Sequence, residues 1–413
     1  MVTDGARREE ILETAAALFA SSGLRTSLRE IADACGILPG SLYHHFDSKE
    51  AIIVELVERY RDDLERVAKE ALDSLHSLEP TPVEDCVIEF GEAIAACAVR
   101  HRAALILTLY DPPKVTGDEL VELARETPTA IDGAMLEILR AGRTGDAIRS
   151  GIDLEMLAER VCQSMLHVGV GAFHSSARAK GVPAQKCRIF LYGVAVRPPS
   201  KAALDGSLAM RAAREVIAAW NGDTEEDERV AHLRTVARAE FGRRGYEATT
   251  MRDISAAAGL STASVYRMFG SKEDLLASIM HSFVENVTRG WDAVLESDSS
   301  ALERLDALMW VNTNLLDRFS EEFKIQLALL RQTPPTSLNL GRTFTKQQRQ
   351  MKKLLADGTR TGEMRIEGAS ADARVFSVME LVWMPPSIVQ KAGLRPAHAL
   401  ARDTVLRGAA KRS

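Results

Sequence analysis

The segment 15–50 reads AAALFASSGLRTSLREIADACGILPGSLYHHFDSKE, and the segment 237–273 of the same chain repeats it as ARAEFGRRGYEATTMRDISAAAGLSTASVYRMFGSKE. Phe19 of the first copy matches Phe241 of the second, and after a single inserted residue both copies end on the same Ser-Lys-Glu run. Self-similarity over such a distance indicates a duplicated structural unit, so one explanation has to serve both copies.

Each copy opens on an amphipathic helix. In the first copy Ile11, Leu12, Ala15 and Phe19 recur at helical spacing, which predicts a helix over about residues 6–21 with one apolar face. A glycine follows directly, and glycine suits the left-handed conformation of a helix C-cap.

Two short helices come next. Ser27 and Glu30 have the spacing of a capping box, and Thr250 and Asp253 repeat that spacing in the second copy. The box predicts that a short helix over residues 28–34 begins directly after Ser27.

A tight turn and a second short helix complete the unit. Gly36 and Gly259 suit the turn, and the helix after it is predicted over residues 39–45. Leu42 and Phe46 lie four residues apart and point toward the core, which leaves the polar side chains around them facing outward. A helix of this kind fits the major groove of DNA, which is about 12 Å wide and admits one helix.

These residues resemble the TetR (tetracycline-repressor-like) family of bacterial regulators. The resemblance rests on the Phe-x-x-x-Gly of the first helix, the Glu-Ile-Ala-like second helix, the Leu-Tyr-x-x-Phe recognition helix (Val-Tyr-x-x-Phe in the second copy) and the Ser-Lys-Glu that opens the fourth helix. It covers residues 7–60 and 229–289. It implies an all-α fold of two tandem TetR-like domains. Each has an N-terminal three-helix DNA-binding head with a helix-turn-helix, followed by a helical bundle for ligand binding and dimerisation.

The resemblance and the punctuation of the chain together predict the domain limits. The first repeat is expected at 1–196 with its head at 5–50, and the second at 227–413 with its head at 228–273. Residues 197–226, punctuated by Pro-Pro and Asn-Gly, are expected to form a linker with room for one helix.

The resemblance implies which side chains face the DNA. Arg29 and Arg252 match a position that reaches base edges, and arginine reads guanine through paired bonds to O6 and N7. Tyr43 and Tyr266 match a tyrosine that contacts phosphate. The alternative is that the arginines are solvated surface residues and the tyrosines packing residues. The predicted DNA contacts in the first copy are Ser27, Arg29, Pro39, Gly40, Ser41, Tyr43, His44, His45 and Lys49. Those in the second copy are Thr250, Arg252, Thr262, Ala263, Ser264, Tyr266, Arg267 and Lys272.

The two recognition helices offer different side chains to the bases. The sequence PGSLYHH in one and TASVYRM in the other cannot read identical half-sites equally, so we predict an asymmetric or imperfectly palindromic operator. The two halves are expected to pack on each other as an intramolecular pseudodimer. Whether two such chains then pair as a further homodimer stays open.

The resemblance also implies a ligand-responsive repressor. Double-stranded operator DNA would be its partner, and a small apolar effector (a lipid, an acyl-CoA, a steroid or a drug-like molecule) would release it. For each candidate pocket residue, plain core packing is the alternative. The candidates are His101, Tyr110 and Phe173 in the first copy, and Trp310, Asn314, Phe319 and Trp383 in the second. The alternative function is a sensor or interaction protein in which one or both heads no longer bind DNA.

Composition sets the remaining limits. The chain has 413 residues, of which 46% are hydrophobic and 27% charged, as is typical of a globular protein. No apolar run reaches the roughly 18 residues of a membrane span, and five cysteines without a CxxC pair favour free thiols in the cytoplasm. The net charge of −6 does not exclude DNA binding, because local positive faces govern affinity.

Motifs of catalysis are missing from the sequence. It contains no P-loop, nucleophile elbow, dinucleotide fingerprint or metal signature, so we expect no enzyme, no catalytic residue, no cofactor and no metal. His44 and His45 are adjacent and do not converge, and Cys162, His167 and His174 have poor ligand spacing.

Overall fold

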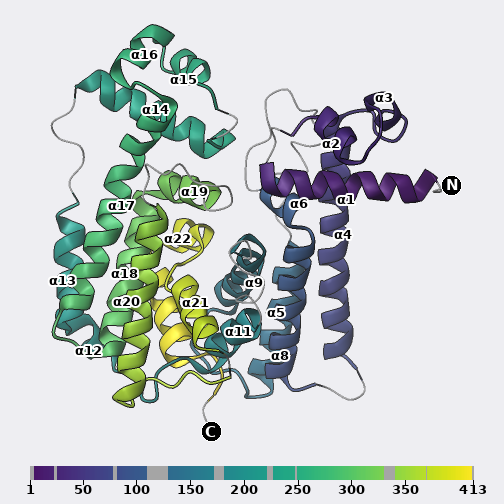
Figure 1. The fold of residues 1–413 in the computed structure, drawn as a ribbon. Helices are drawn as coiled ribbons and strands as arrows, with labels where there is room; N and C mark the ends of the chain where they lie inside the picture. The colour runs from purple at the N-terminus through teal and green to yellow at the C-terminus, as the bar shows by residue number, and fades with distance from the viewer. Residues whose placement is uncertain are drawn as a thin grey trace.

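The computed structural model contains helices and, within the residues it describes, two isolated β-bridges and no strand (Figure 1). The predicted all-α fold is therefore confirmed. The described residues are 4–22, 26–77, 81–108, 129–171, 181–220, 227–246, 249–329, 340–368 and 370–411. None of the helices in these ranges combines the length and apolar character that a membrane crossing requires.

The helices divide into three groups along the chain. Those of the first repeat are α1 (Asp4–Ser22), α2 (Leu28–Ala34), α3 (Pro39–Leu42), α4 (Lys49–Leu75), α5 (Val83–Arg100), α6 (Arg102–Leu107), α8 (Thr129–Thr144), α9 (Leu154–Gly171) and α11 (Val182–Tyr192). Two lie between the repeats, α12 (Lys201–Gly206) and α13 (Leu208–Ala218). Those of the second repeat are α14 (Glu228–Arg244), α15 (Met251–Ala257), α16 (Thr262–Met268), α17 (Lys272–Glu296), α18 (Ala301–Arg318), α19 (Ser320–Leu329), α20 (Leu340–Arg360), α21 (Ala371–Leu381), α22 (Pro386–Ala392), α23 (Leu394–Ala401) and the π-helix η4 (Arg402–Arg407).

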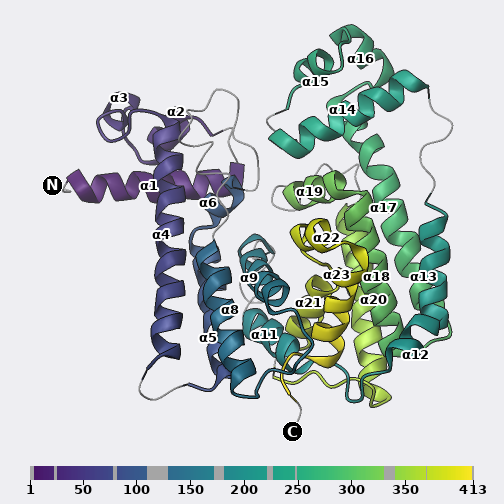
Figure 2. The same cartoon turned by 180° about the vertical axis from the view of Figure 1, so that it is seen from behind.

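Helices α1–α3 and α14–α16 form two small heads. Both lie at the same end of the molecule, away from the C-terminus (Figures 1 and 2). The long helices α4 and α17 lead from the heads into two bundles below them. The predicted inward residues Leu42 and Phe46 are buried, as are Val265 and Phe269 at the matching positions of the second head.

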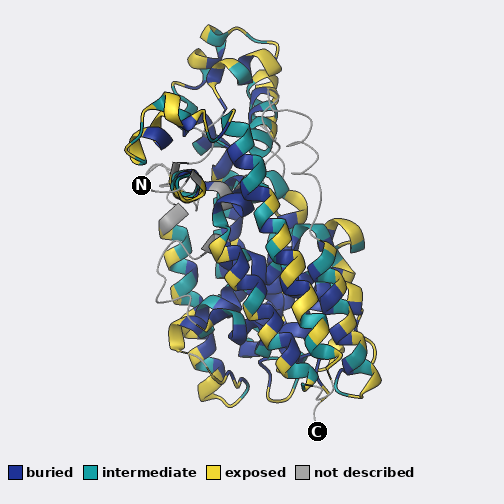
Figure 3. Ribbon diagram, turned by 90° about the vertical axis from the view of Figure 1, so that its right-hand side faces the viewer, coloured by how far each residue is buried: buried dark blue, intermediate teal, exposed yellow. Residues whose placement is uncertain are grey.

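The two bundles contain most of the core. In the first, α4, α5, α8, α9 and α11 pack on one another, and in the second, α13, α17, α18, α20 and α21 do so. Figure 3 shows the buried residues concentrated in the interior of this lower body.

The linker contains two helices where the sequence analysis allowed room for one. Helix α13 buries Ala209, Met210 and Ala213 and packs against α17 and α18 of the second repeat. The hydroxyl of Ser299 accepts a hydrogen bond from the Ala209 amide at 2.9 Å, which satisfies a free amide at the start of α13. This linker helix is thus part of the second bundle.

The two repeats share an interface with buried charges. Helix α11 contacts α21 and η4, and α9 contacts α22. The buried guanidinium of Arg160 donates to the hydroxyl of Thr404 at 2.6 Å and to the carbonyl of Leu381 at 2.8 Å. The equally buried Lys186 forms an ion pair with Glu380, and such fully desolvated groups require their partners to be in place.

Where α11 and η4 end, the backbones of the two repeats pair reciprocally. Each turn donates two hydrogen bonds to the end of the opposite helix. The amides of Val194 and Ala195 donate to the carbonyls of Val405 (2.8 Å) and Leu406 (3.1 Å). In return, the amides of Ala409 and Ala410 donate to the carbonyls of Phe190 (2.8 Å) and Leu191 (2.7 Å). The pattern is unchanged when the two repeats exchange roles, as expected around a local twofold axis.

Two glycines lie at the centre of this crossing. Gly193 has φ +67° and Gly408 has φ +81°, in the region that favours glycine. A Cβ on Gly408 would lie 2.3 Å from the carbonyl oxygen of Leu191, and a Cβ on Gly193 would lie 2.4 Å from that of Leu406. Only glycine lets the two backbones approach this closely.

Candidate nucleic-acid interface

Capping boxes begin the first helix of each helix-turn-helix. The Ser27 hydroxyl accepts from the Glu30 amide at 3.2 Å, and the Glu30 carboxylate accepts from the Ser27 amide at 2.7 Å. Thr250 and Asp253 make the same reciprocal pair at 3.1 and 2.9 Å, as predicted. Hydrogen bonds from the hydroxyl and amide of Thr250 lower the pKa of Asp253, so this carboxylate stays charged beside the helix start.

The turns are made as the sequence predicted, but the recognition helices differ in length. Gly36 and Gly259 have φ +65° and +66°. Helix α16 runs for seven residues and is capped by the Ser261 side chain, whereas α3 has four residues and no side-chain cap. The prediction of a helix over 39–45 is therefore too long.

The shorter α3 has a physical reason in its residues. It carries Gly40 where α16 carries Ala263, and glycine is about 1 kcal/mol less favourable than alanine in a helix. After Leu42 the chain continues as a tighter turn, in which the His45 amide donates to the Leu42 carbonyl at 2.9 Å. His45 thus lies in the turn that follows α3.

Most predicted DNA contacts face outward. Tyr43 is 54% exposed and Tyr266 is 50% exposed, which is unusual for aromatic side chains. The other exposed candidates are Ser27, Arg29, Gly40, Ser41, His44, Thr250, Arg252, Ala263 and Arg267. Those that are half-buried are Pro39, His45, Lys49, Thr262, Ser264 and Lys272.

The two arginines that we predicted to reach base edges differ in their surroundings. Arg29 has Asp33 at 3.9 Å on the same helix, with both side chains largely exposed. Arg252 has no ion-pair partner within the described ranges. Neither guanidinium is held by buried structure, so both can reach a ligand in front of the head.

The side chain of Lys272 forms hydrogen bonds with backbone carbonyls of its own head. Its ammonium donates to the carbonyls of Tyr246 at 2.7 Å and Thr249 at 3.0 Å, and lies 4.1 Å from the centre of the Tyr246 ring. Lys272 therefore holds the start of α17 against the loop before α15. Its contact with phosphate remains a prediction beside this structural role.

Thr262 is also engaged within the second head. Its hydroxyl lies 3.0 Å from that of Ser255, which joins α15 to α16. The first head has Ala32 and Pro39 at the matching positions and lacks this bond. The two helix-turn-helix units thus share a backbone plan but differ in internal bonding.

Leu38 is not among the predicted DNA contacts. This side chain is 76% exposed at the N-cap of α3, directly before the recognition helix. An apolar side chain there can contact a thymine methyl group in the major groove. The signal was available, because Leu38 interrupts an otherwise polar outward face, whereas the second head has Ser261 there.

The heads are attached to the bundles by different contacts. In the first, Arg8 of α1 pairs with Glu55 of α4 and lies 4.5 Å from the centre of the Phe46 ring. In the second, Arg238 of α14 pairs with Glu322 of α19 at 2.6 Å. Each orientation therefore depends on its own set of ion pairs.

The described candidate pocket residues contact separate sets of neighbours. His101 bonds to Asp63, Phe319 contacts the rings of Trp220 and Phe283, and Trp383 stacks on Phe323. Asn314 donates to the carbonyl of Trp310 at 2.8 Å. Tyr110 and Phe173 lie outside the described residues.

Trp310 borders a cavity of about 520 Å³ between the linker helices and the second bundle. Four of its nine lining residues are lysine or arginine, so this cavity is more polar than the pocket that we predicted. The lining residues are Lys201, Asp205, Met210, Arg214, Trp310, Arg395, His398, Ala399 and Arg402. Beneath them the buried Asp306 accepts hydrogen bonds from Arg402 at 2.7 and 2.8 Å, which neutralise both charges.

An all-α body with two exposed helix-turn-helix units defines a class of DNA-binding transcriptional regulators. Residues 11–56 and 233–279 match the family described as "Bacterial regulatory proteins, tetR family". The HTH-type transcriptional repressor KstR2 of Rhodococcus jostii (strain RHA1) is 37% identical over 155 residues, which cover 36% of this chain and 72% of the relative. The KstR2 repressor of Mycolicibacterium smegmatis is 33% identical over 156 residues, which cover 37% and 72%.

Among solved structures, the ketosteroid transcriptional regulator KstR2 of Mycobacterium tuberculosis is 22% identical, covers 43% of this chain and 92% of its own, and has a TM-score of 0.37. The sequence relatives show that the chain belongs to the tetR family of bacterial regulatory proteins, and it carries the family's DNA-binding segment twice.

Proposed function

We propose that this chain is a ligand-responsive transcriptional repressor that binds one operator through two non-identical heads. One observation carries the proposal: two helix-turn-helix units with exposed but different recognition residues lie at the same end of one chain. The sequence relatives that are named repressors support the direction of regulation.

The reciprocal backbone pairing supports an intramolecular pseudodimer. Val194 and Ala409 donate equivalent hydrogen bonds across the local twofold axis, and Arg160 and Lys186 bury their charges at the same interface. A rigid interface of this kind holds the two heads at one spacing. For DNA half-sites this spacing is about 34–36 Å, or a multiple of it.

A single chain is expected to occupy one operator. In sedimentation or light scattering, the protein–DNA complex should have the mass of one chain per duplex. Hydroxyl-radical footprinting should show two protected half-sites of different sequence. Two chains on one operator, or a perfect palindrome protected equally on both arms, would contradict the covalent pseudodimer.

The effector proposal follows from the cavity beside Trp310. Its volume lies within the range of ligand pockets, about 300–1,000 Å³. Its lining combines an indole ring with Lys201, Arg214 and Arg395, so an effector with both an apolar part and negative charge fits it better than a neutral hydrocarbon. Of the predicted effector classes, an acyl-CoA has both properties. Binding there would favour a conformation whose heads are wrongly spaced for DNA.

Arg214→Ala is expected to weaken acyl-CoA binding several-fold, because an exposed ion pair contributes about 0.2–1 kcal/mol. Octanoyl-CoA is a suitable probe, with the quenching of tryptophan emission as the measurement and Trp310→Phe to assign the signal. Arg211→Ala is the matched control, since Arg211 is exposed on the same helix but does not line the cavity. Full operator affinity in the ligand-saturated protein would contradict the release mechanism.

A further inference from the structure

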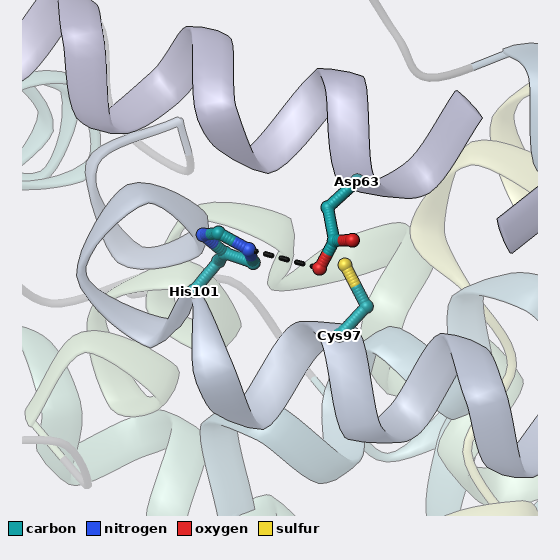
Figure 4. Close-up of side chains that lie close together, drawn as sticks. All are labelled: Asp63, Cys97 and His101. Carbon is teal, nitrogen blue, oxygen red and sulfur yellow. Dashed lines mark hydrogen bonds and ion pairs between the residues drawn. The ribbon is translucent and has the colours of Figure 1, made fainter. Parts of the chain in front are cut away.

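A cluster of three side chains that can ligate a metal lies in the first bundle, away from the predicted DNA contacts. Asp63 comes from α4, Cys97 from α5, and His101 from the junction of α5 and α6 (Figure 4). One carboxylate oxygen, the thiol sulfur and one imidazole nitrogen all lie within 4.8 Å of one another. The Nε2 atom of His101 is 3.0 Å from the Oδ2 atom of Asp63.

We propose that Asp63, Cys97 and His101 form a binding site for a divalent transition metal of the zinc class, which fixes the position of the first DNA-binding head. Cys97 and His101 lie one helical turn apart and so share a face of α5, and Asp63 faces them from α4. A mixed sulfur, nitrogen and oxygen set is typical of zinc, whereas calcium and magnesium prefer oxygen ligands alone.

The second repeat provides an internal comparison for this site. Counted from the lysines that open α4 and α17, Tyr60 and Asp63 correspond to Phe283 and Asn286. Helices α5 and α18 have the same length, so Cys97 and His101 correspond to Leu315 and Phe319. The ring pair is kept as well: Tyr60 and His101 are 5.9 Å apart between centroids, and Phe283 and Phe319 are 6.0 Å apart.

The comparison shows that the fold does not require a carboxylate, a thiol or an imidazole at this place. Leu315 is fully buried and Phe283 nearly so, and the second repeat packs the same junction mostly with hydrocarbon. In the first repeat the half-buried Asp63 bonds to His101 and pairs with Arg66 and Arg100, and the buried thiol of Cys97 lies beside it. The first repeat therefore has at this junction three side chains that can ligate a metal, where the second repeat has none of the same types.

A fourth polar group supports the assignment. The hydroxyl of Tyr60 is buried and has no hydrogen-bond partner within the described part of the chain, and the residue is 3% exposed. Its ring centroid lies 5.9 Å from that of His101. A water molecule on the metal would give this hydroxyl a partner and complete a four-coordinate site.

Charged neighbours set the conditions for binding. Arg66 and Arg100 form ion pairs with Asp63, the latter at 2.5 Å, and Arg66 also pairs with Glu70 at 2.6 Å. The side chains of Arg66 and Arg100 are 49% and 60% exposed, so both can turn to solvent at little cost. The metal then takes their place on the carboxylate.

The charges and protons balance without a redox step. The metal replaces the thiol proton of Cys97, which leaves to solvent, and coordinates the neutral His101 and the ionised Asp63. The two positive charges of the metal ion are thus balanced by the negative charges of the Cys97 thiolate and the Asp63 carboxylate.

The site has a direct connection to the first head. Helix α4 begins at the end of that head, and α6, which follows His101, contacts both α1 and α4. A metal that joins α4 to the end of α5 would fix the angle at which the head leaves the bundle. This coupling rests on the proposed operator binding, whereas the metal site itself does not.

Cobalt(II) titration of the full chain tests the site. We expect one Co²⁺ per chain, with an intense thiolate-to-cobalt charge-transfer band and the visible bands of tetrahedral coordination. Cys97→Ala should abolish the charge-transfer band, and Cys86→Ala, a buried cysteine on the same helix, should retain it. A band that survives in Cys97→Ala, or a wild-type chain without the band, would overturn the proposal.

Two variants separate ligand loss from misfolding, because they install residues that the second repeat already packs. Asp63→Asn and His101→Phe should keep the helical circular dichroism and weaken Co²⁺ binding by about 100-fold or more, beyond the usual effect of outer-shell changes. Unchanged affinity in either variant would remove that residue from the site. Operator affinity measured with and without Zn²⁺ then tests the coupling: a shift in wild type that both variants lose supports it, and no shift overturns it.

Discussion

Gly408→Ala is expected to lower the free energy of unfolding strongly. The loss should exceed that of an alanine substitution at any positive-φ glycine outside the crossing of Gly193 and Gly408. The left-handed, extended conformation of Gly408 disfavours a side chain by about 1–3 kcal/mol wherever it occurs. At this position the new Cβ would also lie 2.3 Å from the Leu191 carbonyl oxygen and 2.4 Å from the Tyr192 carbonyl carbon. Both atoms are backbone, so the two helix ends must separate, which adds about 1–3 kcal/mol or more.

Gly393→Ala is a closely matched control. Gly393 has φ +81° and ψ 171°, close to the φ +81° and ψ 157° of Gly408, but a Cβ there meets nothing within 4 Å. It therefore has the conformational cost without the clash. Urea midpoints at unchanged m-value measure both effects. Equal destabilisation by the two variants would show that the close approach of the two backbones adds nothing to the cost of Gly408→Ala.

The crossing also connects stability to the proposed function. Gly193→Ala should resemble Gly408→Ala, because its Cβ would lie 2.4 Å from the Leu406 oxygen across the same axis. If this interface sets the spacing of the heads, both variants should lose operator affinity under conditions where they remain folded. Gly393→Ala should bind the operator as wild type does.

Arg29→Ala and Arg252→Ala are each expected to weaken operator binding by about 1–3 kcal/mol, which is about 5- to 150-fold in Kd. Each guanidinium is exposed at the start of its helix-turn-helix, where it can donate a pair of hydrogen bonds to guanine. The heads are separate sites, so the free-energy losses of the two variants should add in the double variant.

A gel-shift assay with half-site mutants assigns each arginine to its own arm. Each variant should become insensitive to base changes in one half-site and keep its selectivity for the other. Arg211→Ala, an exposed arginine on the linker helix α13, is the control for non-specific charge and should change affinity little. A defect in only one arginine variant would mean that one head has stopped reading DNA. No defect in either would favour a sensor or interaction protein.

Local signals in the sequence were sufficient for the heads. The capping boxes at Ser27 and Thr250 and the turns at Gly36 and Gly259 form as predicted, because they depend on residues only a few positions apart. The prediction failed at α3, where the helix pattern continued past Leu42 but the uncapped, glycine-containing helix stopped.

Sites assembled from distant residues could not be predicted in this way. Asp63 meets Cys97 and His101 because α4 and α5 lie side by side, and neither helix carries a recognisable metal motif. The aromatic residues predicted for a pocket have their residue type in common, and residue type does not specify their neighbours. Trp310, Phe319 and Trp383 contact different neighbours, because each faces the helix that happens to pack on it.

The amino-acid order therefore specifies the duplication, the helices, the helix caps and the identity of the side chains offered to DNA, since all of these follow from spacing along one or two turns. Helix packing specifies the rest: the glycine crossing at Gly193 and Gly408, the cationic cavity beside Trp310 and the cluster around Asp63. These features depend on which faces of distant helices meet. That outcome is set by burial over the whole chain, and no short stretch of sequence contains it.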